Sequence, residues 1–148
     1  MVVYFLLALS FSLNNFCSAS QFKKLRVISL APSTTEILFA LGLDEEIVGV
    51  SLYCNYPNQA LTKEKVGTFS QPNIEKILSL KPDIIFCTGL EQVPSITKLR
   101  QLNLKVYVSD PSNMEELFDS IREIGELVNK ENQALALIKE MKTGIEKI

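Results

Sequence analysis

Apolar positions along the chain follow two recurring patterns. Short apolar runs rich in β-branched residues predict buried strands, and they lie at residues 27–30, 47–50, 83–87 and 105–108. Apolar residues spaced three and four apart predict amphipathic helices, and these stretches lie at residues 33–41, 73–80, 94–102 and 112–128. Strand and helix therefore alternate four times. This order predicts an α/β fold, a Rossmann-like parallel sheet with helices on both faces.

Polar residues mark where these helices begin. Ser33 with Glu36, and Ser112 with Glu115, have the spacing of a capping box, in which hydroxyl and carboxylate each accept from a backbone N–H at the helix start. Asn73 is the expected cap of the second helix. The sequence thus predicts helix starts at Ser33, Asn73 and Ser112.

A further apolar stripe begins after Lys130 and runs to the last residue. Its members recur at spacings of three and four, and they are Ala134, Ile138, Met141, Ile145 and Ile148. Such a stripe predicts a helix that packs on another surface. The stripe ends without glycine, proline or any other helix-end signal, so we expect the polypeptide to be cut short.

The turns after the predicted strands are expected to meet at one edge of the sheet. In a parallel sheet the carboxyl ends of the strands line a crevice where ligands usually bind. Residues 31–33, 51–57 and 88–89 fall on that edge. The loop after the second strand is long and carries Tyr53 and Tyr56, and long loops in compact domains are often functional. Alternatively, both tyrosines cover the edge of the core.

The composition is that of one ordinary globular domain, with 148 residues, 47% hydrophobic and 22% charged, and a net charge of −2. No basic cluster is interleaved with aromatic residues, which argues against nucleic-acid binding. The chain has no histidine, so it lacks the usual general base, the Ser-His and Cys-His dyads, and the commonest zinc ligand. The sequence therefore favours binding, with no metal site and no catalytic residue.

The first nineteen residues carry no charge, and residues 2–13 form an apolar run of the length of a signal-peptide core. Small residues at Cys17 and Ala19 predict cleavage after Ala19, so residues 1–19 are the expected signal peptide. The run is too short for a transmembrane span, which needs about 20 apolar residues. One alternative is a lipid anchor at Cys17, which the large Phe16 before it disfavours. Another is a buried N-terminal strand or helix.

Export would leave Cys54 and Cys87 in an oxidising compartment. Both follow or end strands on the same edge, so they could form a disulfide. Burial as two separate small apolar residues is the favoured arrangement. No Cys-x-x-Cys pair is present, which argues against a redox site.

Three motifs carry a family resemblance. They are RVISLAPSTTEILFALGL at residues 26–43, GVSLYCNYP at 49–57 and VGTFSQPNIEKILSLKPDIIFCTG at 66–89. From Lys24 to Ile148 the chain resembles the periplasmic substrate-binding proteins of ABC importers for cobalamin and iron chelates, in which two α/β lobes are joined by one long helix. The resemblance implies that residues 20–128 form the N-terminal lobe and that residues 129–148 begin the helix between the lobes.

The resemblance also implies roles for particular residues. Tyr53 matches a tyrosine that packs against the corrin, and Phe69 matches a ligand-facing aromatic residue. The turns at Pro32-Ser33 and Thr88-Gly89 would form the floor and side of the half-site. Glu75 matches an exposed acidic residue that docks onto arginines of the membrane permease. From the sequence alone, Phe69 could equally fill the core, and capping explains Ser33 without a ligand.

These implications predict the substrate-binding component of an ABC importer. It would capture cobalamin or a related corrinoid in the periplasm, as a monomer without a cofactor, and deliver it to the permease and ATPase complex. An iron–siderophore or haem ligand is the nearest alternative, whereas zinc or manganese capture would need the absent histidines. A truncated Rossmann-like enzyme is a further alternative, but the turn at residues 31–33 lacks the Gly-x-Gly-x-x-Gly loop that approaches a pyrophosphate.

Overall fold

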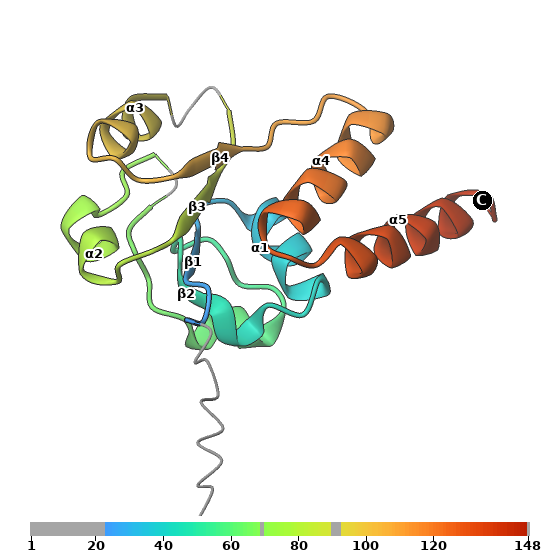
Figure 1. The fold of residues 1–148 in the computed structure, drawn as a ribbon, viewed down its shortest axis with the longest axis horizontal. Helices are drawn as coiled ribbons and strands as arrows, with labels where there is room; N and C mark the ends of the chain where they lie inside the picture. Colours follow the sequence, from blue (N-terminus) through green and yellow to red (C-terminus); the bar gives the residue numbers. More distant parts are fainter. Residues whose placement is uncertain (1–22, 69, 90–92, 148) are drawn as a thin grey trace, which may run out of the picture.

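The computed structural model describes residues 23–68, 70–89 and 93–147 (Figure 1). The expected signal peptide, Phe69 and the final isoleucine lie outside these ranges. Parallel strands form a sheet of four in the order β2-β1-β3-β4. They are β1 (Val27–Ser29), β2 (Ile47–Val50), β3 (Ile84–Cys87) and β4 (Val106–Val108). Each strand lies within one of the predicted apolar runs.

Helices cover both faces of the sheet, which confirms the predicted fold class. The helices are α1 (Pro32–Ala40), α2 (Ile74–Ser79), α3 (Val93–Gln101), α4 (Met114–Leu127) and α5 (Glu131–Ile145). Of these, α1, α4 and α5 pack on one face, whereas α2 and α3 pack on the other (Figure 1). Short 3-10 helices, η1 (Asp44–Glu46) and η2 (Asn58–Thr62), lie in the loops before and after β2.

Alternation along the strands divides the core into two clusters. On one face, Val27, Ile84 and Phe86 pack with α1, α4 and α5. On the other face, Ile28 and Ile85 pack with α2 and α3. Successive side chains of a strand point to opposite faces, so strands covered on both sides read as continuous apolar runs in the sequence.

The first helix begins before its predicted cap. Ala31 is the N-cap in an extended conformation, Pro32 is the first helical residue, and no side chain caps this helix end. Proline suits that position because it has no N–H to leave unpaired and its fixed φ is helical. Ser33 is therefore an exposed residue inside the first turn. The capping box predicted from Ser33 and Glu36 is wrong.

The other two helix starts test the same reasoning. In α4 the cap is Asn113, whose Oδ1 accepts from the Glu116 backbone N–H at 2.9 Å. The Glu116 carboxylate accepts from the Ser112 backbone N–H at 2.7 Å, and this hydrogen bond lowers the pKa of Glu116. The predicted box therefore lies one residue further along the chain than expected. Asn73 caps α2 as predicted.

The last helix leaves a tight turn after α4 and extends away from the sheet (Figure 1). Gly125 lets the two helices approach, because a Cβ built there would lie 2.5 Å from the Ala134 Cβ. Ala134 and Ile138 are buried as the stripe predicted, whereas Ile145 is 48% exposed. Met141, between them, is partly buried against the same cluster. Within the described ranges, no helix is long and apolar enough to cross a membrane.

Candidate functional site

The strand order places a topological switch point between the carboxyl ends of β1 and β3, the position at which open α/β sheets form their binding crevice. From β1 the chain crosses through α1 to β2, and from β3 it crosses through α3 to β4, so the two connections run in opposite directions and over opposite faces. Ligands of open α/β sheets bind at such a switch point. Pro32-Ser33 follows β1 and Thr88-Gly89 follows β3. The structure therefore brings these two predicted turns to neighbouring strand ends.

The turn after β3 also lies against the end of β4. The Ser109 backbone N–H donates to the Cys87 carbonyl at 2.9 Å. A Cβ built on Gly89 would come within 1.9 Å of the Asp110 Oδ2. Glycine at this position leaves room for the Asp110 carboxyl beside the crevice.

Ser33 also lines a part of the surface that the sequence did not indicate. It is one of the residues around an apolar hollow of about 370 Å³ on the flank where α1, α4 and α5 meet. Tyr56, Ile37, Leu117 and Met141 line the same hollow. Ser33 thus follows the end of β1 and also borders the flank beside it.

The loop after β2, Ser51–Pro57, is called the aromatic loop below. Three of its residues are largely exposed to solvent, with exposed fractions of 53% for Leu52, 60% for Tyr53 and 65% for Tyr56. These fractions contradict the alternative that both tyrosines cover the edge of the core. A group of large apolar side chains kept in solvent is typical of a binding surface.

Beneath the aromatic loop lies a buried hydroxyl–thiol cluster, made of Ser29, Thr34, Thr35, Ser51 and Cys54. The Thr35 hydroxyl lies 3.1 Å from the Cys54 Sγ and 2.8 Å from the Ser29 Oγ. The Ser51 Oγ lies 3.1 Å from the same sulfur. The cluster joins β1, α1 and the aromatic loop at the edge of the crevice. Sequence analysis missed it, although serines directly at the ends of two buried strands were a visible signal.

Main-chain hydrogen bonds hold the same loop from both sides. The Ser51 N–H donates to the Ser29 carbonyl at 3.0 Å, and the Leu52 N–H donates to the Gly67 carbonyl at 2.9 Å. Gly67 adopts a φ of 102°, a left-handed conformation that glycine tolerates best. The segment around Gly67 thus lies beside the aromatic loop. Phe69, its predicted ligand-facing residue, lies outside the described residues.

The two thiols are separate and buried, as favoured from the sequence. Both Cys54 and Cys87 are free cysteines. Burial raises the pKa of the Cys87 thiol to about 12, so that thiol stays protonated and unreactive at neutral pH. Among the described residues, no group of three or more histidine, cysteine, aspartate or glutamate side chains could hold a metal ion.

Glu75 is exposed in the first turn of α2. The helix begins near the crevice edge, because Asn73 donates its backbone N–H to the Val66 carbonyl and the adjoining Gly67 contacts the aromatic loop. An acidic side chain there is favoured by the helix dipole. Glu75 is thus an exposed carboxylate on a helix that begins near the aromatic loop.

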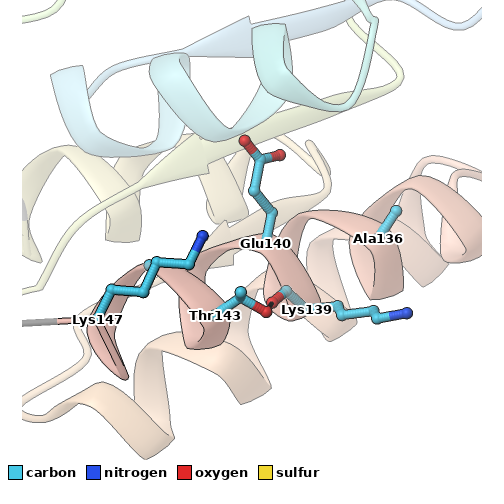
Figure 2. Close-up of a pocket in the computed structure, with 6 residues that line it drawn as sticks. Ala136, Lys139, Glu140, Thr143 and Lys147 are labelled. Atoms are coloured by element: carbon cyan, nitrogen blue, oxygen red, sulfur yellow. Dashed lines mark hydrogen bonds between the residues drawn. The ribbon is translucent and has the colours of Figure 1, made fainter.

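A further hollow of about 480 Å³ lies along α5 (Figure 2). Its lining residues come from that helix and from the turn directly after it, and they are Ala136, Lys139, Glu140, Thr143, Gly144 and Lys147. Figure 2 shows the Lys139 and Glu140 side chains pointing in different directions from the helix. A surface groove made by one helix has no opposing wall, so it does not form a second binding site.

Comparison with known proteins places the chain in a family. Residues 27–148 match the periplasmic binding protein family. This match covers most of the chain, so the chain belongs to the periplasmic binding protein family.

One relative is the vitamin B12-binding protein of Vibrio cholerae. The two sequences are 45% identical over 104 residues, which are 70% of this chain and 38% of that protein. A crystal structure of the periplasmic vitamin B12-binding protein of the same species superposes with a TM-score of 0.76 at 36% identity. The superposition covers 82% of this chain and 48% of that one.

Two further similar proteins come from Bacillus subtilis and Staphylococcus epidermidis. An uncharacterised ABC transporter substrate-binding lipoprotein of Bacillus subtilis is 36% identical over 127 residues, covering 83% of this chain and 40% of that protein. A possible iron-binding, periplasmic solute-binding protein of Staphylococcus epidermidis superposes with a TM-score of 0.75 at 33% identity, covering 82% of this chain and 49% of that one. The chain therefore spans less than half the length of each of these relatives.

Proposed function

We propose that this chain is a ligand-binding lobe of an ABC importer's substrate-binding component, with cobalamin or a related corrinoid as its ligand. The observation that carries the proposal is the switch point between the carboxyl ends of β1 and β3, flanked by the exposed aromatic loop. Identity of 45% to a vitamin B12-binding protein supports the choice of ligand. A binding role, without catalysis, agrees with the family and with a crevice edged by hydroxyl, amide and aromatic groups.

A corrinoid is a broad, mostly apolar ring with amide edges, so its binder needs flat aromatic surface together with hydroxyl or backbone donors. In our proposal Tyr53 and Phe69 supply the aromatic surface. The turns at Pro32-Ser33 and Thr88-Gly89 supply the donors. The 60% exposure of Tyr53 supports its part in this arrangement, because the ring is available to a ligand without displacing other side chains.

Titration of the chain with cyanocobalamin, haemin and a ferric siderophore tests the proposal. Binding is followed by calorimetry and by tyrosine fluorescence. We expect saturable heat with cyanocobalamin. The titration should extend to concentrations well above micromolar, because one lobe supplies only part of the contacts and its affinity should be low. Absence of saturable binding with all three compounds would contradict a binding function.

The iron–chelate alternative has its own support in the likeness to the possible iron-binding protein of S. epidermidis. The same titration separates the two ligand classes. Tighter binding of the siderophore or of haemin than of cyanocobalamin would assign the lobe to iron chelates, with the same crevice as the site.

We further propose that Glu75 docks onto the permease and ATPase complex, outside the cytoplasm. Exposure in the first turn of α2 supports this role, since exposed charges on a rim steer association. Glu75→Gln should weaken retention of the chain on permease-containing membranes. Glu115→Gln is the matched control, because Glu115 is an exposed glutamate in the first turn of α4. Equal loss with both variants would contradict a specific docking role.

The two ends of the chain and its oligomeric state have expected properties as well. Residues 1–19 would be removed on export, and N-terminal sequencing of the exported chain should begin at Ser20. Residues 129–148 would begin the helix between two lobes, and the chain would be a monomer. Analytical ultracentrifugation measures the mass of the chain in solution. A mass of about twice 16.6 kDa would contradict a monomeric state.

A further inference from the structure

The aromatic loop has its largest side chains in solvent. Leu52, Tyr53 and Tyr56 are all more than half exposed, so burial of these side chains contributes little to the order of the loop. Fixing the backbone of a residue in one conformation costs about 1–2 kcal/mol. The contacts that offset this cost must therefore come from beneath the loop.

Lys65 makes two such contacts. Its Nζ donates to the Cys54 carbonyl at 2.8 Å and to the Ala60 carbonyl at 3.0 Å. Cys54 is the middle of the aromatic loop, and Ala60 lies in η2 just after it. An ammonium group has three donors and no acceptor, and hydrogen bonds from a charged donor are stronger than neutral ones. A single half-buried side chain thus joins the loop to the helix that follows it.

The backbone of Lys65 is itself fixed to the sheet. Val50 at the end of β2 donates to the Glu64 carbonyl at 2.9 Å and accepts from the Val66 N–H at 3.0 Å. The ammonium group therefore reaches the loop from a backbone segment that is hydrogen-bonded to the end of β2. From the other side, the buried Cys54 thiol contacts Thr35 and Ser51. Cys54 is held through both its carbonyl oxygen and its sulfur.

We propose that Lys65 is a positioning residue for ligand binding, which holds the aromatic loop in its binding conformation before the ligand arrives. This inference rests on the function proposed above. A loop that is already ordered loses less conformational entropy when the ligand binds, so its affinity is higher. Lys65 acts through the loop, and Tyr53 remains the side chain that meets the ligand.

Lys65→Met tests the proposal because it removes the ammonium group and keeps an unbranched apolar stem. Lys63→Met is the matched control. The Lys63 Nζ lies 2.7 Å from the Asp44 Oδ1 and 5.9 Å from the centre of the Phe39 ring. Lys63 is thus a largely buried lysine two positions away, and it contacts η1 and α1 instead of the aromatic loop.

The first readout is amide hydrogen exchange in the chain without ligand. The Leu52 and Cys54 amides report on the loop, since they donate to the Gly67 and Ser51 carbonyls. We expect both amides to exchange at least about tenfold faster in Lys65→Met, because their protection depends on the local opening of the loop. Lys63→Met should leave them unchanged. Lys65→Gln, which keeps N–H donors but loses the charge, should lie between.

The second readout is affinity for whichever of cyanocobalamin, haemin and the ferric siderophore the unmodified chain binds. Lys65→Met should weaken binding about tenfold, and Lys63→Met should leave affinity unchanged. Unchanged exchange at Leu52 and Cys54 overturns the inference, and so does faster exchange with unchanged affinity. If the unmodified chain binds none of the three compounds, the proposed function fails, whereas exchange still decides whether Lys65 holds the loop. If Lys65→Met does not fold, Lys65→Gln provides the same comparison.

Discussion

The two edges of the sheet are built from different interactions. At the amino edge, where strands begin, exposed charges pair: the Lys23 Nζ lies 2.6 Å from the Asp83 Oδ1, and Lys24 pairs with Glu45. Asp83 also accepts from the Arg26 backbone N–H at 2.9 Å. At the carboxyl edge, where strands end, the hydroxyl–thiol cluster is neutral and buried, with the exposed aromatic loop above it.

The difference follows from what each edge has to do. Exposed ion pairs are worth little and tolerate motion, since water and salt screen them. Buried neutral hydrogen bonds fix geometry and are costly to break, because the partner left behind finds no water. The edge that we propose binds ligand is the one held by directional contacts away from solvent. Substitutions should therefore cost more at the carboxyl edge, and only there should they change affinity.

The largest effect is expected from Gly67→Ala. A Cβ at Gly67 would lie 2.6 Å from the Asn73 backbone nitrogen and 2.7 Å from the Gln71 carbonyl oxygen, with φ at +102°. Strained backbone and overpacking each cost about 1–3 kcal/mol, so the free energy of unfolding should fall by about 4 kcal/mol. Urea denaturation measures it. The control is Gly42→Ala at the amino edge, where φ is also positive but a Cβ meets nothing within 4 Å. Gly42→Ala should lower the free energy of unfolding by about 1 kcal/mol. An equal loss in both variants would mean that the clash of the added Cβ with residues 71–73 does not destabilise the fold.

Cys54→Ala and Cys87→Ala separate hydrogen bonding from packing. Both thiols are buried, so each truncation leaves a similar small cavity that costs about 1 kcal/mol. Cys54→Ala also removes the sulfur that Thr35 and Ser51 contact at 3.1 Å. Thr35 keeps its hydrogen bonds to Ser29 and Ala31. The buried Ser51 hydroxyl, however, loses its contact, and leaving a buried hydroxyl unpaired costs about 1–3 kcal/mol. We expect Cys54→Ala to unfold at lower urea concentration, with an extra loss of about 1–2 kcal/mol. Equal losses would mean that the cluster contributes only packing.

Much of the fold could be predicted from local pattern. Buried parallel strands are apolar on both faces, so runs such as residues 84–87 were visible without any knowledge of their neighbours. The order of elements then fixed which turns share an edge. Exposure of Tyr53 was compatible with the sequence but not determined by it, since a tyrosine in a loop can as well cover the core.

Details set by competition between neighbouring residues were not predictable. Ser33 is a residue type that commonly caps helices. Pro32 before it is already the first helical residue, however, so the N-cap is Ala31. The contact of Lys65 with the Cys54 carbonyl joins residues 11 positions apart through the folded loop. Sequence reasoning placed Ser33 with the crevice, and it did not predict that Ser33 also borders the hollow beside α4 and α5. Only tertiary packing decides such contacts.

Tyr53→Ala should lower affinity about tenfold or more, since an aromatic ring stacked on a ligand is worth about 1–2 kcal/mol. Its 60% exposure predicts almost no change in the free energy of unfolding. Tyr56→Ala is the matched control, because Tyr56 belongs to the same loop but lines the hollow on the flank of α1. Calorimetric titration of both variants measures the difference. A larger loss for Tyr56→Ala would move the ligand from the crevice to that hollow.

The smallest effect belongs to the amino edge and depends on pH. The hydrogen bond from Lys23 holds the pKa of the Asp83 carboxyl below its usual value of 3.8, and the Arg26 backbone N–H acts in the same direction against the opposing effect of burial. A carboxyl with a lowered pKa in the folded state stabilises the fold at pH above its unfolded pKa. That contribution is lost as pH falls through the folded pKa. The Asp83 side chain is 29% exposed and that of Lys23 is 73% exposed, so the loss should be about 1 kcal/mol or less.

Asp83→Asn isolates this contribution. We expect the variant to be slightly less stable than the unmodified chain at pH 7. The difference should begin to shrink as pH falls through the unfolded pKa of about 4, and it should be lost as pH falls through the lower folded pKa of the carboxyl. Urea denaturation at a series of pH values measures it. Ligand affinity at pH 7 should be the same in both proteins, since Asp83 lies at the edge opposite the crevice. An Asp83→Asn variant with weakened affinity would show that the two edges are coupled through the short strands. The inference that only the carboxyl edge determines affinity would then be wrong.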